Sequence, residues 1–274
     1  MPLDQVDVDK IEQKETPEMS FLEHLEELRW HIIRSTVVIT LVAIGVYVGI
    51  DWIFRYVING PRNEWFPTYR LICSISETLC FYPPKLEMVA VEFGEQFIIS
   101  IKVSLLLSII IAFPYIFWEI WRFIKPGLYD KERKAARGIV LICTGLFFSG
   151  VSFGYFIISP FAVTFLGNYT LGEVVNTPTL ASYINYMTMF TLPVGLVFEL
   201  PIVVYFLAKI GLLYPDFMRT YRRHALVIIL IAAAVITPPD AITQMLIGLP
   251  LYILYEISIH ICQRVVSKAE EASL

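Results

Sequence analysis

One apolar stretch constrains the fold of this chain more than any other: residues 189–207 read MFTLPVGLVFELPIVVYFL. The stretch is long enough to cross a lipid bilayer as a helix, yet it carries Glu199 near its middle, between Pro193 and Pro201. A carboxylate at membrane depth is costly unless it is neutralised, paired or hydrated. Its neighbours at helical spacing have neither a charge nor a side-chain donor. Two interpretations stay open: a protonated Glu199 hydrogen-bonded to a neighbouring helix, or a water-filled cavity around which the two prolines bend the helix.

The composition indicates that most of the chain lies in a membrane. Of its residues 57% are hydrophobic and only 17% are charged, whereas soluble domains carry about 25% charged residues. The apolar runs predict an all-α integral membrane protein with six transmembrane helices, at 32–50, 97–118, 139–160, 184–208, 225–237 and 241–262. The fifth is short for a bilayer, and Thr237-Pro238-Pro239-Asp240 joins it to the sixth in a tight hairpin.

The distribution of Lys and Arg predicts the orientation. Most of them lie in the N-terminal segment, in the second-to-third and fourth-to-fifth connections and at the C-terminus, which places these segments and both termini in the cytoplasm. The acidic residues 1–19 predict a flexible N-terminal tail without a cleavable signal peptide. Residues 20–264 then form the membrane domain, and 265–274 form a cytoplasmic C-terminal tail.

The longest connection, residues 51–96, is predicted to lie on the outer side and to cap the bundle, because it is rich in aromatic residues. It holds Cys73 and Cys80 on the oxidising side of the membrane, where we expect a disulfide, two free thiols being the alternative. The net charge of −4 argues against a nucleic-acid partner. The sequence suggests no metal site, no cofactor and no catalytic residues.

Two carboxylates on the predicted cytoplasmic side lack a basic neighbour. The capping box Ser20-Phe21-Leu22-Glu23 predicts an amphipathic helix that lies along the membrane surface before it turns into the first span. Glu27 on this helix and Glu132 in the second-to-third connection have no Lys or Arg three or four positions away. They are either two solvated surface acids or a site for a guest cation, and paired carboxylates suit a guanidinium group.

Four short motifs resemble those of one known family. They are His24-Leu25-Glu26-Glu27-Leu28-Arg29, the run from Trp121 to Tyr129 continuing to Glu132-Arg133, Phe198-Glu199-Leu200-Pro201, and Thr237-Pro238-Pro239-Asp240 with Gln244. In order, spacing and topology the chain resembles the TatC subunit of the twin-arginine protein translocase from about Ser20 to Arg264. The resemblance implies a concave bundle in a bacterial cytoplasmic (inner) membrane. It also implies a receptor for signal peptides with two consecutive arginines, in a complex that exports folded proteins with the proton gradient as driving force.

The resemblance assigns roles to particular residues. It implies that Glu27 and Glu132 hold the two arginines, and that Phe123, Leu25 and Arg29 shape the surrounding groove. Glu199 is implied to face a concave pocket within the membrane. The resemblance also implies that Thr237, Asp240 and Gln244 dock TatA-like and TatB-like single-span subunits in an oligomeric complex. Pro61 and Tyr155 match structural positions of the family.

The chain also departs from the family pattern. His31 stands where the family commonly has a second Arg, so the charge there depends on pH. The outer loop from about Arg62 to Lys85 is longer than expected. A secondary transporter or channel that uses Glu199 as a coupling carboxylate is the alternative, although the sequence shows no internal repeat. An intramembrane enzyme is disfavoured, because the spans hold no pair of aspartates.

Overall fold

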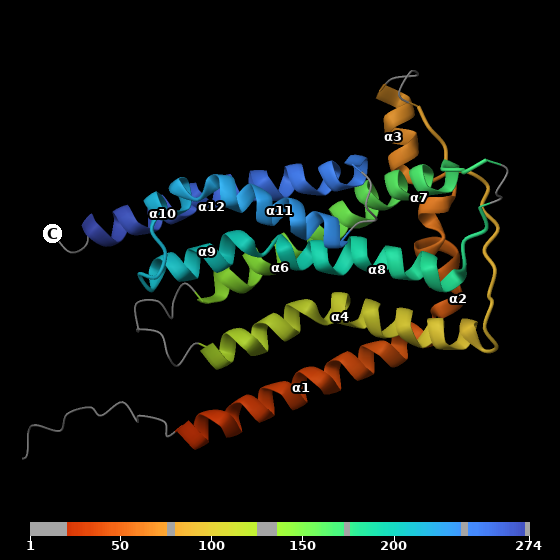
Figure 1. Ribbon diagram of the computed structural model, residues 1–274. Coiled ribbons are helices and arrows are strands. Elements are labelled where there is room, and N and C mark those ends of the chain that lie inside the picture. Colours follow the sequence, from red (N-terminus) through yellow and green to blue (C-terminus); the bar gives the residue numbers. More distant parts are fainter. Residues whose placement is uncertain (1–20, 76–79, 125–135, 173–175, 237–240, 272–274) are drawn as a thin grey trace, which may run out of the picture.

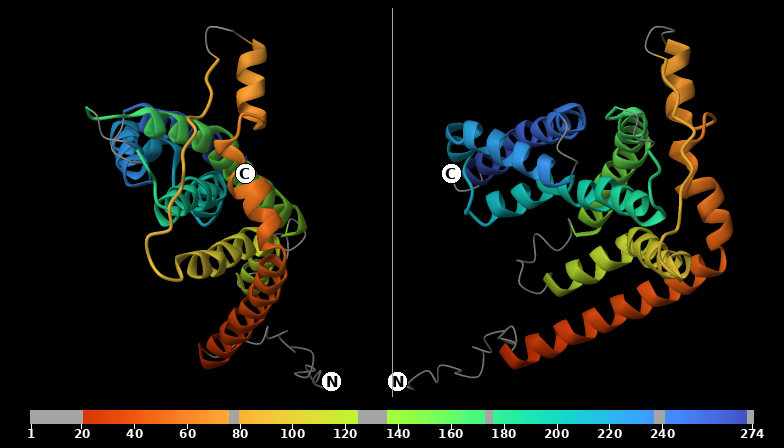
Figure 2. Two further views of the ribbon diagram at one scale, coloured as in Figure 1. Left: turned by 90° about the vertical axis from the view of Figure 1, so that its right-hand side faces the viewer. Right: turned by 45° about the vertical axis from the view of Figure 1, so that its right-hand side comes forward.

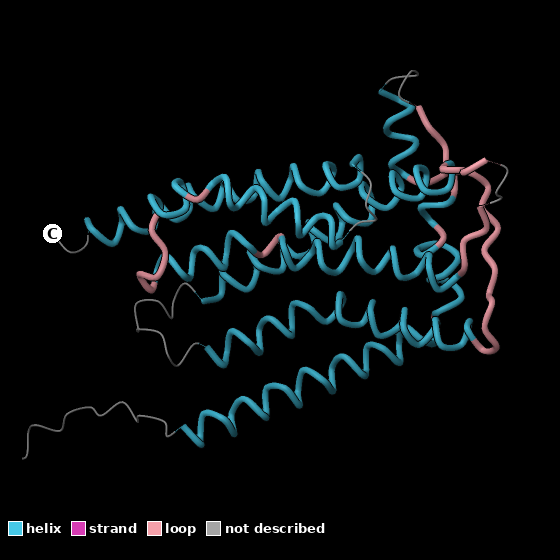
Figure 3. Tube along the Cα trace, in the orientation of Figure 1, coloured by secondary structure: helices cyan, strands magenta, loops and turns pink. Residues whose placement is uncertain are grey.

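The computed structural model describes residues 21–75, 80–124, 136–172, 176–236 and 241–271, and the structural statements below concern these ranges. The helices are α1 (Phe21–Val48), α2 (Ile50–Ile53), α3 (Pro67–Ile75), α4 (Glu95–Ile124), α6 (Ala136–Phe153), α7 (Ser159–Asn168), α8 (Leu180–Val197), α9 (Leu200–Lys209), α10 (Pro215–Thr220), α11 (Arg222–Ile236) and α12 (Ala241–Glu271). Short π-helical turns at Phe54–Ile58 and Gly154–Ile158 and a 3-10 turn at Gly60–Arg62 complete the helical part. In the described ranges the only β-type pairing is an isolated bridge between Val89 and Thr179, and the chain is otherwise helix and loop (Figure 3).

The described helices confirm the predicted all-α membrane fold. Five stretches are long and apolar enough to cross a membrane: Leu25–Val48, Glu95–Ile124, Gly138–Asn168, Leu180–Lys209 and Thr243–Lys268. They correspond to the predicted spans one to four and six. α11 covers the predicted fifth span with 15 residues, which rise about 22 Å against a hydrocarbon core of about 30 Å. That α11 crosses the bilayer as a fifth span stays a prediction.

The first helix differs from the sequence-based prediction. We expected a surface helix that turns into the first span, but α1 is one continuous helix from Phe21 to Val48 (Figure 1). The reason is local, because this segment holds no proline and its first glycine is Gly45. Nothing therefore interrupts the backbone hydrogen bonds where the turn was expected.

The helices run between two ends of the molecule (Figures 1 and 2). α1 lies at one edge and packs chiefly on α4, which in turn packs on α6 and α8. α12 packs on both α9 and α11. One end holds the start of α1, the end of α4, the start of α6, α10 and the end of α12 (Figure 1). The other end holds α2, α3, α7 and the extended segment 80–94. The connection from α9 to α11, and the described helix ends that flank the other connections predicted to be cytoplasmic, lie at the first end.

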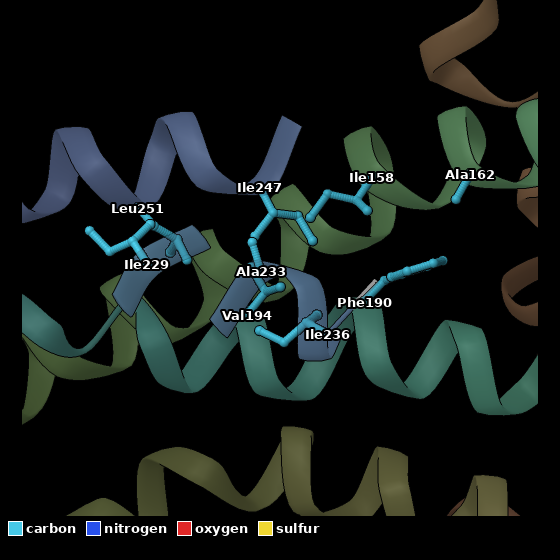
Figure 4. Packing of buried hydrophobic residues seen from close by; sticks show 9 residues of the cluster. All are labelled: Ile158, Ala162, Phe190, Val194, Ile229, Ala233, Ile236, Ile247 and Leu251. Carbon is cyan, nitrogen blue, oxygen red and sulfur yellow. The ribbon is translucent and has the colours of Figure 1, made fainter. Parts of the chain in front are cut away.

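The largest buried cluster joins α11 and α12 to the rest of the bundle (Figure 4). Its members from α11 and α12 meet aliphatic and aromatic side chains of α7, α8 and the turn before α7; the cluster comprises Ile158, Ala162, Phe190, Val194, Ile229, Ala233, Ile236, Ile247 and Leu251. Gly154 lies beside this cluster, where an added Cβ would come within 1.9 Å of the Phe190 carbonyl oxygen. The backbones of the Gly154 turn and of α8 therefore approach closely because position 154 has no side chain.

Tyrosine hydroxyls hold together the end of the molecule that carries α2, α3 and α7. Tyr155 donates a 2.6 Å hydrogen bond to the Val57 carbonyl, and Tyr183 donates one of 2.7 Å to the Ile58 carbonyl. Tyr69 donates to the Pro61 carbonyl at 2.6 Å. Burial raises the pKa of Tyr69 to about 12, despite the opposing effect of a hydrogen bond with Thr164, so its hydroxyl keeps its proton at neutral pH. These bonds tie the irregular turns at residues 54–62 to α3, to α8 and to the turn before α7.

The outer segment also contains the disulfide that the sequence suggested. Cys73 on α3 is bonded to Cys80, with their Cα atoms 4.4 Å apart. Figure 1 shows α3 projecting from the bundle instead of lying across it. The extended segment after Cys80 does contact the bundle, since Arg62 donates to the Leu86 carbonyl and Leu180 N–H donates to Val89 O at 3.0 Å. Only part of the segment 51–96 therefore packs as the expected cap.

Candidate functional site

Glu27 lies near the start of α1 with one unsatisfied carboxylate oxygen. Its side chain is 36% exposed, so a partner from outside can reach it. The Oε2 atom is nevertheless buried, and it has no hydrogen-bond partner among the described residues. The Oε1 atom lies 3.9 Å from Nε2 of His31, which is beyond hydrogen-bond distance. Glu27 is thus held at a partly open position with acceptor capacity to spare.

A buried histidine connects Glu27 to α4. His31 is 5% exposed, and its Nδ1 is hydrogen-bonded to Oε2 of Glu119, which is 1% exposed. The other oxygen of Glu119 accepts a 2.8 Å hydrogen bond from the hydroxyl of Tyr115, one turn earlier on α4. The Glu119 carboxylate is therefore satisfied by two donors, and the ring of His31 is fixed between two acidic side chains.

Glu119 was not predicted as a site residue. The predicted second span ended at residue 118, so this acid fell one position outside it, whereas α4 continues to Ile124 and buries Glu119 against α1. Its position between Trp118 and Trp121 was a usable signal, because an acid surrounded by large apolar residues needs a partner. The partner could not be found from spacing, since His31 lies 88 positions away in sequence.

The structure brings some of the predicted groove residues together. The ring of Phe123 meets that of His31 edge to face, with centroids 6.0 Å apart and the planes at 69°. His31 therefore contacts Phe123 and faces Glu27. Leu25 and Arg29 are exposed on the same end of α1. Glu132, predicted as the second arginine-binding carboxylate, lies outside the described residues.

Glu199 lies at a break between two helices. α8 ends at Val197 and α9 starts at Leu200, so the interruption falls just before Pro201. In a continuous helix the ring of Pro201 would clash with the carbonyl group of the residue four positions earlier. Both carboxylate oxygens of Glu199 are buried. The thiol of Cys143 and the backbone of Phe147 lie close to it, but neither makes a hydrogen bond of normal geometry with it. The predicted water-filled cavity stays a prediction.

The remaining predicted residues lie toward the other end or in the α11–α12 hairpin. Gln244 on α12 donates a 3.0 Å hydrogen bond to the Leu230 carbonyl on α11. Thr237 and Asp240, predicted with it as a docking patch, lie outside the described residues. Pro61 is buried and accepts the bond from Tyr69, while Tyr155 bonds to Val57. In the described ranges no group of three or more His, Cys, Asp or Glu side chains is placed to hold a metal ion.

The fold defines a multi-pass α-helical membrane protein whose helices bury the carboxylates of Glu119 and Glu199. The model of the family described as "Sec-independent protein translocase protein (TatC)" matches residues 23–250. The chain therefore belongs to the TatC family, the Sec-independent (twin-arginine) protein translocase subunits, which is a family of protein transport.

Individual relatives agree with this assignment. The chain is 38% identical to the Sec-independent protein translocase protein TatC of Blattabacterium sp. subsp. Periplaneta americana (strain BPLAN), over 91% of this chain and 97% of that protein. It is 36% identical to that of Desulforapulum autotrophicum, over 94% of this chain and 89% of the relative. A crystal structure of the "Twin Arginine Translocase Receptor- TatC" matches with a TM-score of 0.69 and 32% identity, covering 89% of this chain and 99% of the other.

Proposed function

We propose that this chain is the receptor for twin-arginine signal peptides, with Glu27 and Glu132 as the carboxylates that bind the two guanidinium groups. The observation that carries the proposal is the buried, unsatisfied oxygen of Glu27 on a side chain that solvent still reaches. A guanidinium can donate two parallel hydrogen bonds to such a carboxylate, whereas a lysine ammonium offers only a point charge. The similar crystal structure, described as a receptor, supports the same function.

The other proposed roles follow the family. TatA-like and TatB-like single-span subunits dock at Thr237, Asp240 and Gln244, and the assembled complex exports folded cargo, driven by the proton gradient. The chain lies in a bacterial inner membrane with both termini cytoplasmic, so Glu27 faces the compartment in which cargo is made. The apolar part of the signal peptide then moves from the Glu27 site toward the region of Glu199, within the membrane.

Binding of a synthetic signal peptide to the detergent-purified, full-length protein tests the receptor function. A charge-assisted contact contributes about 1.5–3 kcal/mol, so Glu27→Gln should weaken binding about ten- to hundredfold. Glu132→Ala should abolish crosslinking to the same peptide. We also expect a twin-lysine peptide to bind the unaltered protein poorly.

Glu26→Gln is the matched control, because Glu26 is the exposed neighbour of Glu27 on the same helix and loses the same charge. It should bind the twin-arginine peptide with nearly unaltered affinity. An equal loss of affinity in both variants would mean that the peptide responds to the net charge of this surface and not to a specific contact with Glu27. Equal binding of twin-arginine and twin-lysine peptides would argue against recognition of guanidinium groups.

A further inference from the structure

The buried imidazole of His31 is the polar group that the proposed function leaves unused. Its Nδ1 is hydrogen-bonded to Glu119, while its Nε2 lies 3.9 Å from Oε1 of Glu27. The imidazole therefore lies between a satisfied carboxylate and one with an unsatisfied oxygen. Both nitrogens of a protonated histidine are donors, whereas a neutral histidine has one donor and one acceptor.

The charges around this imidazole make its proton decisive. Among the described residues, the titratable and charged groups near the His31–Glu119 pair are Glu27 and Arg34 from α1 and Tyr115 from α4, and Arg122 of α4 lies near Tyr115. Arginine stays charged at all relevant pH values, and an ordinary tyrosine titrates near pH 10. Histidine is thus the residue type in this group that ordinarily changes its charge between pH 5.5 and 8.

The two protonation states offer different surfaces to an incoming arginine. With His31 neutral, its Nδ1–H donates to Glu119, and the lone pair on Nε2 lies beside Glu27, so a guest N–H meets only acceptors. With His31 protonated, a positive N–H on Nε2 faces Oε1 of Glu27. That N–H competes for the carboxylate and repels the guest guanidinium.

We propose that His31 is a positioning residue that sets the charge Glu27 offers to a signal-peptide arginine, so that peptide capture weakens as the imidazole gains its second proton. This inference rests on the proposed binding of an arginine at Glu27. The inference goes beyond the proposed binding, because it makes capture of the signal peptide depend on pH. The contact of His31 with Phe123 extends the same control to the aromatic wall of the groove.

The test measures the affinity of a fluorescent twin-arginine peptide, without histidine or acidic residues, for the detergent-purified protein from pH 5.5 to 8.0 at constant salt. The unaltered protein should bind about tenfold more weakly at pH 5.5 than at pH 8.0, the size expected for one unit charge a few ångströms from the guest. His31→Gln keeps a polar side chain but does not titrate, so its affinity should change less than about twofold over this range. His260→Gln, an exposed histidine on α12, is the control and should keep the full pH dependence.

Glu119→Gln provides a second variant that leaves His31 in place. Because the imidazolium loses its anionic partner, binding at pH 5.5 should recover toward its value at pH 8.0. A flat profile for the unaltered protein, or the same profile for His31→Gln, would overturn the inference. If Glu27→Gln binds the peptide at pH 8.0 as well as the unaltered protein does, the proposed arginine site at Glu27 fails instead, so the two failures are distinguishable.

Discussion

Glu199 presents a residue-scale problem that neither its helix nor its described neighbours solve. Its oxygens are buried beside the Cys143 thiol and the backbone of Phe147, and none of them has a hydrogen bond of normal geometry. A buried polar group without partners costs about 1–3 kcal/mol, and more when it is charged. The carboxylate of Glu199 therefore needs hydrogen bonds from water or from an arriving partner.

A pair of substitutions at Glu199 separates polarity from packing. We expect Glu199→Gln to retain partial export of a twin-arginine reporter, because the amide keeps a polar group in the same place. Glu199→Leu should reduce export about tenfold or more, since an apolar side chain excludes water and removes the hydrogen-bonding capacity. Export is measured in cells, with immunoblots to normalise for the protein present in the membrane. Equal activity of the two variants would contradict the water-filled cavity.

The individual residues also show where sequence reasoning stops. Glu27 could be singled out because helical spacing shows that no cation of its own helix is near, and the structure leaves one of its oxygens unsatisfied. The His31–Glu119 contact could not, because it joins α1 to α4 across 88 positions. Spacing reports contacts within one helix, whereas contacts between helices depend on how the helices pack.

At the scale of elements, the close approach of α8 and the Gly154 turn is the most sensitive packing feature. We expect Gly154→Ala to destabilise the protein by about 3 kcal/mol or more, because the new Cβ would collide with the Phe190 carbonyl and backbone atoms cannot move aside cheaply. Gly145→Ala on α6, the helix that leads into this turn, is the matched control, since its Cβ meets no atom within 4 Å. Thermal unfolding in detergent should show a clear loss for the first and little change, or a small gain, for the second. Equal stability of the two variants would contradict the packing described here.

Helix existence could be predicted from the sequence, whereas helix limits and continuity could not. Apolar runs located each main helix, because a bilayer requires long uninterrupted stretches. The prediction of a separate surface helix at the start of the chain was wrong. An amphipathic pattern shows which face of a helix is apolar but not where the helix bends, and α1 has no residue that would bend it there. A helix bent by Pro193 and Pro201 around Glu199 was one of the two interpretations left open. The structure instead interrupts the helix between Val197 and Leu200, just before Pro201, whereas α8 continues through Pro193.

At the scale of the whole molecule, the two ends differ in their chemistry. One end combines α10, the start of α1 and the end of α12, and it holds Glu27 and His31 together with the helix ends that flank the basic connections. The other end holds the tyrosine-bonded turns and the Cys73–Cys80 disulfide. A disulfide is favoured in an oxidising compartment, and Lys and Arg are retained on the cytoplasmic side, so both features predict the same orientation of the molecule in the membrane.

The orientation can be tested by cysteine labelling, because the native cysteines give a low background. Cys143 and Cys262 are buried, and Cys73 is bonded to Cys80. Ala90→Cys and Ser267→Cys each place a thiol at an exposed position, at opposite ends of the molecule. In spheroplasts, a membrane-impermeant maleimide should label position 90 at once and position 267 only after the membrane is permeabilised, since moving the basic end outward is opposed by its charge. The reverse pattern would place Glu27 on the outer side, away from newly made cargo, and would refute the receptor function proposed for this end.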